Sequence, residues 1–413
     1  MRRIFEISVA SLLVGSIVFP TVFVQAKAVA FLIALLSAVH LLVSRGATIR
    51  SDIGIFWIGY PILGLAWSLY GVASGNPGAV PVLSVMFVYP LLFPVLAFCY
   101  EKDNEHSLYG VLKFSAWILV LLNLMYIVSS SFLDGGGIAP VMQEVFGDNA
   151  VVDDAEEYFK FTLPNVSSLL FLIPFFFAAT AFGYSRVTLC NAALVFLLFA
   201  VGVLSGRRAL LMSVVLGPLL AYFLTYGSRR IHVGLVNFAR LRLIILTVAP
   251  LVFIWLFYSD RAGFYVEQLF SVFDFSENAS NVERRLQFEA LWGGLKDSPF
   301  FGLGAGAAAS YSRSIDQPWA YELSYMAFAF QYGLIGFSLY ASGLCFIVLG
   351  LRRFVIYSGR NDFSFCVLSG LISFLIANAT NPYLGKFDFM WVIFIPLALV
   401  GCRSGNIASE VAR

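Results

Sequence analysis

Long apolar runs with few or no charged residues recur along the whole chain, and shorter polar stretches separate them. A helical run of about 20 such residues can cross the hydrocarbon core of a bilayer, because each helical residue adds about 1.5 Å. The strands of a membrane β-barrel alternate apolar and polar positions over about 10 residues, whereas these runs are longer and uniformly apolar. The pattern therefore predicts an all-α polytopic integral membrane protein with a single transmembrane domain over 1–413.

We expect about 12 transmembrane helices, with boundaries good to about three residues. The expected spans are 4–24, 27–44, 54–74, 79–100, 108–132, 162–183, 188–204, 209–226, 243–259, 322–350, 364–380 and 388–402. An acidic loop at 134–161 and a large loop at 260–321 interrupt them, the second between the ninth and tenth spans. The first span is also similar to a cleavable signal peptide, but the many spans that follow favour an uncleaved membrane helix.

The distribution of positive charge predicts the orientation of these spans. If the N-terminus lies in the cytoplasm, most of the 26 Lys and Arg residues fall on the cytoplasmic side, as the positive-inside rule requires. Both termini are then cytoplasmic, and both long loops face the outer side of the membrane. The cytoplasmic loops are short and contain no GxxxxGK[ST] motif, which argues against a nucleotide-hydrolysing domain. We therefore expect the functional residues in the outer loops.

The composition agrees with this assignment and excludes other classes of protein. Hydrophobic residues make up 60% of the chain and charged residues 12%, whereas a soluble domain is about one quarter charged. A soluble enzyme and a disordered chain are therefore excluded, and a net charge of +2 gives no reason to expect a nucleic acid partner. The five cysteines show no CxxC spacing, so the sequence supports neither a structural zinc site nor a disulfide framework.

A helix in the second outer loop carries the first candidate residues. Ser280-Asn-Val-Glu283 is a capping box and predicts that a helix begins there. Arg284 and Arg285 fall in the first turn, where cations oppose the helix dipole unless an anion binds. The alternative is an ion pair between Arg285 and Glu289 on a solvated face. An apolar stripe suited to the membrane surface follows, formed by Phe288, Leu291, Trp292 and Leu295.

Two further motifs on the outer side are typical of phosphate or sugar binding. Gly302, Gly304 and Gly306 alternate, so their backbone amides could approach a phosphate or sugar closely, although glycines also occur at turns and tight helix contacts. Arg207 and Arg208 occupy a short turn between the seventh and eighth spans. Arginine forms charge-assisted hydrogen bonds to phosphate, and contact with lipid headgroups is the alternative.

Carboxylates supply the candidate base. Glu322 lies where the large loop re-enters the membrane, and partial removal from water makes a carboxylate a better base. The alternative is an ordinary solvated residue. Glu6 lies within the first span, where we expect it to pair with Arg2 or Arg3. The acidic loop has no spacing typical of a calcium site and is interpreted as a solvated lid that contacts a sugar chain.

These motifs occur in an order that resembles one bacterial family. The segment from Arg284 to Gly306, with Trp292 and then Ser-Pro-Phe-Phe-Gly-Leu-Gly-Ala-Gly, resembles the large periplasmic loop of the O-antigen ligase and polymerase family. The following segment, Glu322 to Gly336, resembles the next helix of that family, and Gly206-Arg207-Arg208 looks like its arginine at an outer helix end. The part that carries the motifs is roughly 204–337.

The resemblance implies a C-type membrane glycosyltransferase that is metal-independent, needs no cofactor and inverts the anomeric configuration. Such enzymes face the periplasm from the bacterial inner membrane. They pass a glycan from a polyprenyl diphosphate-linked donor to a glycan acceptor or lipid A core. By matching position, the catalytic residues would be Glu322, Arg285 and Arg208, and the substrate-binding residues Arg207, Arg284, Gly304, Gly306, Tyr321 and Tyr325. Membrane lipids and a chain-length regulator are further candidate partners.

One departure from the family pattern bears on the reaction. The ligase branch places a histidine where this chain has Glu322, and none of the three histidines is expected on the outer side. We therefore favour a polymerase of O-antigen or a related surface polysaccharide, with a ligase as the closest alternative. A transporter of lipid-linked sugar should show charges near mid-membrane or broken helices, which the sequence does not reveal. A non-catalytic scaffold does not explain the paired arginines.

Overall fold

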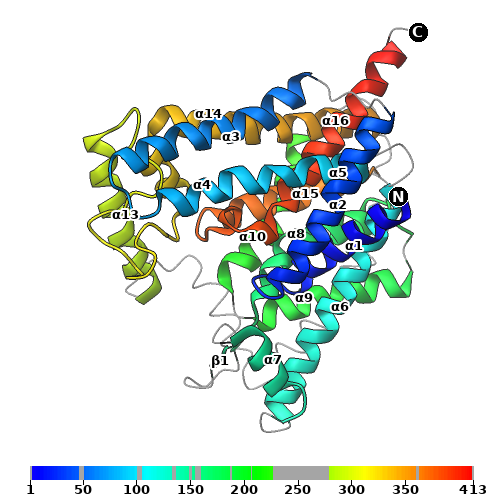
Figure 1. Ribbon diagram of the computed structural model, residues 1–413. Coiled ribbons are helices and arrows are strands. Elements are labelled where there is room, and N and C mark those ends of the chain that lie inside the picture. The colour runs from blue at the N-terminus through cyan, green and yellow to red at the C-terminus, as the bar shows by residue number, and fades with distance from the viewer. Residues whose placement is uncertain are drawn as a thin grey trace.

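A computed structural model gives the fold of the chain (Figure 1). It describes residues 2–45, 51–99, 105–132, 136–147, 151–153, 160–186, 188–205, 207–226, 279–359 and 362–411. Its elements, in chain order, are α1 (Arg2–Val18), α2 (Val24–Arg45), α3 (Ser51–Ala73), α4 (Ala79–Val88), η1 (Tyr89–Leu91), α5 (Leu92–Cys99), α6 (Glu105–Phe132), α7 (Ala139–Phe146), β1 (Val151–Asp153), β2 (Lys160–Thr162), η3 (Pro164–Ser168), α8 (Leu169–Ala181), α9 (Leu189–Leu204), α10 (Arg208–Leu224), α13 (Ala279–Asp297), α14 (Ser324–Ser358), α15 (Phe363–Asn378), η4 (Tyr383–Gly385), η5 (Phe387–Phe389) and α16 (Trp391–Val411).

The protein is a helical membrane protein. Six helical stretches among the described residues are long and apolar enough to cross a membrane: Val24–Ser44, Ile53–Ala73, Ala79–Ala97, Glu105–Ser130, Pro164–Ala181 and Ser324–Ser358. Shorter apolar helices lie at further predicted spans, at Leu189–Leu204, Leu210–Leu224, Phe363–Asn378 and Trp391–Gly401. The number of twelve spans stays a prediction, and the span near 243–259 lies outside the described residues.

The acidic loop contains short elements that the sequence pattern did not predict. Helix α7 lies within it, and β1 pairs with β2 in an antiparallel two-stranded sheet. Its residues 154–159, which include three of its acidic side chains, lie outside the described part of the chain. The lid interpretation of this loop therefore stays a prediction.

Helices α8 and α15 form the centre of the bundle. Nearly every residue of both is buried, although neither has a polar face. A helix that is apolar all round faces either lipid or other helices, and these two pack against each other, with α10 beside both (Figure 1). By contrast, α2, α3 and α14 keep many large apolar side chains exposed, as expected for helices that face lipid.

Helix α14 is broken at Gly333, whose φ of 65° and ψ of −179° are not helical. The loop that follows α13 fills the break with backbone hydrogen bonds. Leu334 N donates to Pro299 O over 2.8 Å, Leu303 N to Phe330 O over 3.1 Å, and Gly304 N to the Gln331 carbonyl over 2.9 Å. An unpaired backbone group in lipid costs several kcal/mol, so this loop is an integral part of the membrane domain.

Helix α13 lies across the ends of α3, α4 and α14 in Figure 1. We call this end of the bundle the loop face, and we define it by α13, the segment 298–323 and the α15–α16 loop, 379–390. It is the side that the charge pattern predicts to be outer. The predicted helix at Ser280 is observed as α13, which is described from Ala279 onward.

Gly306 should be essential for this packing, because a Cβ built on it would lie 2.0 Å from the carbonyl carbon of Gly78, and its φ is 71°. Gly306→Ala should therefore lower the free energy of unfolding by about 1–3 kcal/mol. Gly293→Ala is the matched control, since a Cβ there meets nothing within 4 Å. The check is the unfolding temperature of both variants in detergent. Equal temperatures would contradict the tight packing of the loop.

Candidate functional site

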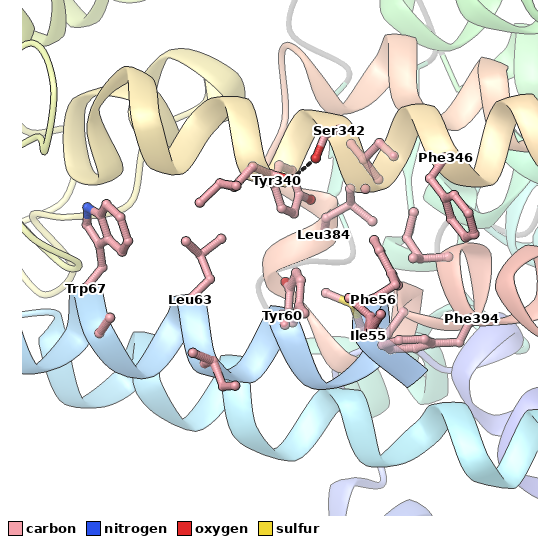
Figure 2. A pocket seen from close by; sticks show the side chains of 18 residues that line it. Ile55, Phe56, Tyr60, Leu63, Trp67, Tyr340, Ser342, Phe346, Leu384 and Phe394 are labelled. Atoms are coloured by element: carbon pink, nitrogen blue, oxygen red, sulfur yellow. Dashed lines mark hydrogen bonds between the residues drawn. The ribbon is translucent and has the colours of Figure 1, made fainter. Parts of the chain in front are cut away.

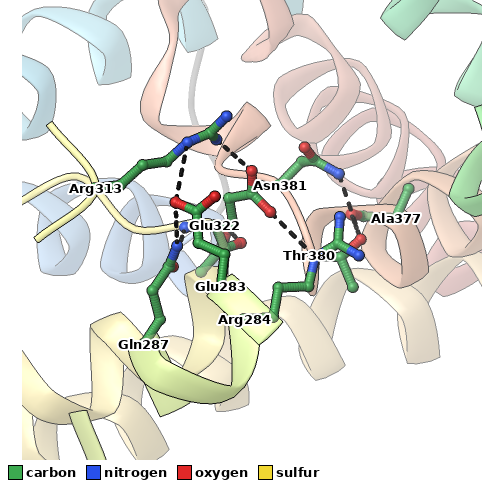
Figure 3. Close-up of polar contacts among 9 residues, drawn as sticks. Glu283, Arg284, Gln287, Arg313, Glu322, Ala377, Thr380 and Asn381 are labelled. Atoms are coloured by element: carbon green, nitrogen blue, oxygen red, sulfur yellow. Dashed lines mark hydrogen bonds and ion pairs between the residues drawn. The ribbon is translucent and has the colours of Figure 1, made fainter. Parts of the chain in front are cut away.

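Two arginines share one carboxylate at the loop face (Figure 3). Arg284 Nε donates to Glu322 Oε2 over 3.0 Å, and Arg313 Nη1 donates to Glu322 Oε1. Glu322 has 13% of its side chain exposed, whereas Arg284 has 32% and Arg313 53%. The carboxylate is therefore more deeply buried than the two arginine side chains that bind it.

Helix α13 supplies the other side chains that hold this cluster. Glu283 and Gln287 are four residues apart and therefore share one face of the helix, and Arg284 lies on the neighbouring face. Glu283 Oε1 forms an ion pair with Arg313 Nε at 3.3 Å, and the buried Gln287 accepts from the Glu322 amide over 2.9 Å. Two acidic and two basic side chains balance one another in charge. We call Glu283, Arg284, Arg313 and Glu322 the carboxylate–guanidinium cluster.

Neutral polar groups from the α15–α16 loop lie beside this cluster. Arg284 points toward Thr380 and Asn381 in Figure 3. Asn381 Nδ2 donates to Thr380 Oγ1 over 3.3 Å, and Thr380 Oγ1 contacts the Ala377 carbonyl. Amide and hydroxyl groups of this kind exchange hydrogen bonds with sugar hydroxyls.

Two further cations lie on separate segments, Arg207 in the α9–α10 turn and Lys386 in the α15–α16 loop. Arg207 precedes α10 and donates from Nη1 to the neutral Ser167 Oγ over 2.8 Å. Lys386 follows η4. The surrounding protein and the positive charge of Arg207 lower the pKa of Lys386, and Asp388 opposes the change.

Asp388 is already bound to other groups. Its Oδ1 pairs with Lys27 Nζ at 2.5 Å, and its Oδ2 accepts from the Thr21 amide at 2.8 Å. The side chains of Lys27 and Asp388 are only 7% and 10% exposed. Asp388 thus joins η5 to α2 through Lys27 and to the α1–α2 turn through Thr21, so its role is to hold these segments together.

An apolar groove runs into the membrane from the loop face, between α3, α14 and the start of α16 (Figure 2). Its volume is about 500 Å³, and none of its lining residues is charged. Trp67 marks its end at the loop face, because the Trp67 indole donates to the Phe301 carbonyl over 2.7 Å. Leu384 of the α15–α16 loop also lines it. The α15–α16 loop therefore lines the groove through Leu384 and lies beside the carboxylate–guanidinium cluster through Thr380 and Asn381.

The predicted glycine amides do not have the predicted geometry. Gly304 N donates to the Gln331 carbonyl, and Gly306 N donates to Gln331 Oε1 over 3.2 Å. Neither amide is free to hold a phosphate, because each already has an acceptor within the protein. A Cβ on Gly304 would also lie 2.8 Å from Gly71 Cα. These glycines instead allow the loop to pack against α3 and α4.

The two predicted tyrosines also have partners within the protein. Tyr321 is 2% exposed and its hydroxyl accepts from the Ala309 amide. Burial raises the pKa of Tyr321, and the hydrogen bond from Ala309 opposes that shift. Tyr325 OH donates to the Leu375 carbonyl over 2.7 Å and ties α14 to α15. A direct role in glycan binding is therefore not visible for either hydroxyl.

The structure distinguishes between the two arginines of the α13 pair. Arg284 contacts Glu322, whereas Arg285 is exposed and does not pair with Glu289, although both of these residues are described. Arg208 begins α10, but its side chain lies outside what the structure describes. Arg2 pairs with Glu6, as expected. Sequence reasoning missed Arg313, because one cation in a polar loop gives no signal of its own.

The apolar stripe of α13 is divided between two environments. Leu291 and Leu295 are buried beside the loop and α14, whereas Phe288 and Trp292 remain about half exposed. Phe288 stacks on Trp292, and Lys296 Nζ lies 5.5 Å from the Trp292 ring. The prediction that all four residues lie on the membrane surface was therefore wrong for the two leucines.

No family model matches the chain, and no curated protein matches it. The resemblance to the O-antigen ligase and polymerase family thus rests on the motif residues alone. Within the described ranges, no three His, Cys, Asp or Glu side chains lie together in a way that could hold a metal ion.

Removing the Asp388 carboxylate should destabilise the protein strongly, because Lys27 would remain buried without its counter-charge. Asp388→Ala should lower the free energy of unfolding by about 3–5 kcal/mol. Glu6→Ala, which breaks the exposed pair with Arg2, should cost about 1 kcal/mol or less. Unfolding in mixed micelles compares the free energies of the two variants. A loss for Asp388→Ala as small as that for Glu6→Ala would show that the Lys27–Asp388 pair does not stabilise the protein.

The lowered pKa of Lys386 predicts that its amine loses its proton at lower pH than an ordinary lysine. Nuclear magnetic resonance of the ¹³C-methylated protein can follow this titration, and the signal missing from Lys386→Arg identifies the residue. Arg207→Gln removes the neighbouring positive charge and should raise the pKa of Lys386. An unchanged Lys386 pKa in Arg207→Gln would show that the two cations do not interact.

Proposed function

We propose that the protein is a glycosyltransferase that uses a polyprenyl diphosphate-linked glycan as donor and works at the loop face. The observation that carries this proposal is the position of two guanidinium groups on one carboxylate beside an apolar groove. A lipid diphosphate has matching chemistry, since its headgroup is a strong anion and its tail is a hydrocarbon. The resemblance of the motif residues to the O-antigen family supports the same substrate class.

The groove and the carboxylate–guanidinium cluster would hold opposite parts of the donor. The groove is lined by apolar and aromatic side chains such as Phe56, Leu63 and Phe394, which suit an unsaturated hydrocarbon chain. The part of a long chain that exceeds the groove would remain in the bilayer. Arg284 and Arg313 would bind the diphosphate through charge-assisted hydrogen bonds, for which arginine is well suited.

Binding of the donor would also release the base. Glu322 accepts from both guanidinium groups in the structure, and a diphosphate that takes over these donors would leave the carboxylate without them. A carboxylate that is partly buried and freed of its partners is able to accept a proton. Glu322 would thus become an active base only once a donor is bound, which limits unproductive hydrolysis.

The proposed reaction is a single displacement at the anomeric carbon of the donor. A hydroxyl oxygen of the acceptor sugar forms the new bond to that carbon, and Glu322 takes the hydroxyl proton. The bond from the carbon to the diphosphate oxygen breaks, and the lipid diphosphate leaves with the electron pair. Arg284 and Arg313 would stabilise the negative charge that develops on it.

A polymerase fits the residues better than a ligase or a transporter does. Glu322 stands where the ligase branch has a histidine. Two helices are interrupted, at η1 and at Gly333, and interrupted helices are typical of transporters. However, the backbone groups at the Gly333 break bind the protein's own loop. That break therefore offers no free backbone site for a transported ligand.

The test is the surface-polysaccharide profile of a strain in which variants replace the gene. Glu322→Gln and Arg284→Gln should each lower polymer formation by about 100-fold, with a single repeat retained on the acceptor. Glu289→Gln is the matched control, because it removes an exposed carboxylate from the same helix, and it should leave the profile unchanged.

The same profile distinguishes the alternatives. Long lipid-linked chains that accumulate without transfer would indicate a ligase. Normal chain-length ladders in both Glu322→Gln and Arg284→Gln, with each variant present in the membrane at the level of the original chain, would refute the proposed enzyme.

A further inference from the structure

Gln287 binds the main chain of Glu322 from helix α13. Its side chain is buried, and its Oε1 accepts from the Glu322 amide over 2.9 Å. Its Nε2 lies 3.5 Å from Oε1 of Glu283, one turn earlier on the same helix. A buried side-chain amide that loses its partners destabilises the protein. These contacts therefore fix the Gln287 side chain in one place, and Gln287 in turn fixes the Glu322 amide.

Helix α13 thus holds Glu322 in two different ways (Figure 3). Arg284 Nε donates to the carboxylate over 3.0 Å, and Gln287 accepts from the amide. The contact with Arg284 joins two opposite charges, so a second anion can compete for the guanidinium group. The contact with Gln287 joins two neutral groups, and an anion gains far less by replacing it. Of these two contacts, the one with Gln287 should therefore survive the arrival of an anion.

Hydrogen bonds on either side of Glu322 hold the same stretch of main chain. The Glu322 carbonyl accepts from the Ser324 amide over 2.9 Å, where α14 begins. Tyr321 is buried, and its hydroxyl accepts from the Ala309 amide. The bond to Gln287 adds the amide of Glu322 itself and connects this stretch to α13. The main chain of Glu322 is therefore fixed relative to α13.

The proposed reaction makes this support necessary. Donor binding would take both guanidinium groups away from the Glu322 carboxylate, which removes two of the contacts that hold the side chain. A general base must nevertheless stay within hydrogen-bond reach of the proton that it accepts. A displacement of about 1 Å can lower the rate by about 100-fold. Groups other than the two arginines must therefore hold Glu322 while the acceptor hydroxyl attacks.

We propose that Gln287 is a positioning residue, which keeps Glu322 in place for proton transfer once the donor diphosphate has taken its two arginine partners. This inference rests on the proposed function and adds a division of roles to it. Arg284 and Arg313 bind the diphosphate, Glu322 takes the proton, and Gln287 touches neither substrate. Because Gln287 acts through the main chain of Glu322, its loss should slow the transfer step without weakening donor binding.

Hydrogen exchange tests the contact itself, in the full-length protein in nanodiscs and by mass spectrometry at single-amide resolution. Gln287→Met has a similar volume but offers no comparable acceptor, so it should speed exchange of the Glu322 amide by about tenfold. Gln331→Met is the matched control, because the buried Gln331 accepts from the Gly306 amide over 3.2 Å. It should speed exchange at Gly306 and leave exchange at Glu322 unchanged.

Steady-state kinetics test the role in transfer. Lipid-linked glycan extracted from a deletion strain serves as the substrate, which the proposed polymerase uses as donor and as acceptor. Gln287→Met should lower kcat by about 100-fold and leave KM unchanged, whereas Arg284→Gln should also raise KM. If Gln287→Met does not fold, Gln287→Asn makes the same comparison, because its shorter side chain holds the acceptor oxygen away from the Glu322 amide.

Exchange at Glu322 that is equally slow in Gln287→Met and in the original chain would overturn the contact. Faster exchange with an unchanged kcat would show that Gln287 does not position the base. A raised KM would show that it acts on donor binding instead. If the original chain itself transfers no glycan, the proposed enzyme fails and the role of Gln287 in transfer fails with it, while the exchange measurement still shows whether Gln287 holds the main chain of Glu322.

Discussion

The loop face depends on one constraint of the bilayer, which is that a backbone group in lipid must find a partner within the protein. Helix α14 breaks at Gly333, and the segment 299–304 supplies the missing hydrogen bonds. That segment joins α13 to the membrane domain, so it fixes where Arg284 lies relative to Glu322. The break is therefore the structural reason why a polar cluster can form beside an apolar groove.

Electrostatics then decides what the loop face can bind. The carboxylate–guanidinium cluster is balanced in charge, and the Lys27–Asp388 pair is buried and closed. Arg207 donates to the neutral Ser167 hydroxyl, and Arg285 is exposed. In the proposed function, an anion with a hydrocarbon tail would bind the carboxylate–guanidinium cluster by replacing Glu322. The same face thus combines the buried Lys27–Asp388 pair with the charge-balanced carboxylate–guanidinium cluster.

The sequence predicted the parts of this fold that depend on local pattern. Apolar runs located the apolar helices that the structure describes, and the capping box indicated a helix where α13 lies. The sequence did not show which of Arg284 and Arg285 contacts Glu322. Consecutive helical residues point about 100° apart, so only the orientation of the folded helix decides which one does. The pairing of Lys27 with Asp388 joins residues 361 positions apart, and no local pattern reports such a contact. Arg313 and the groove depend on tertiary packing in the same way.

The most direct test of the central claim is the affinity of the purified protein in nanodiscs for a polyprenyl diphosphate and for the polyprenol of equal length. The two ligands share the tail and differ only in the anion. If guanidinium groups at the loop face bind the headgroup, the diphosphate should bind about 100-fold more tightly than the alcohol, which corresponds to two charge-assisted hydrogen bonds. Equal affinities would show that these arginines do not bind a lipid diphosphate and would contradict the account.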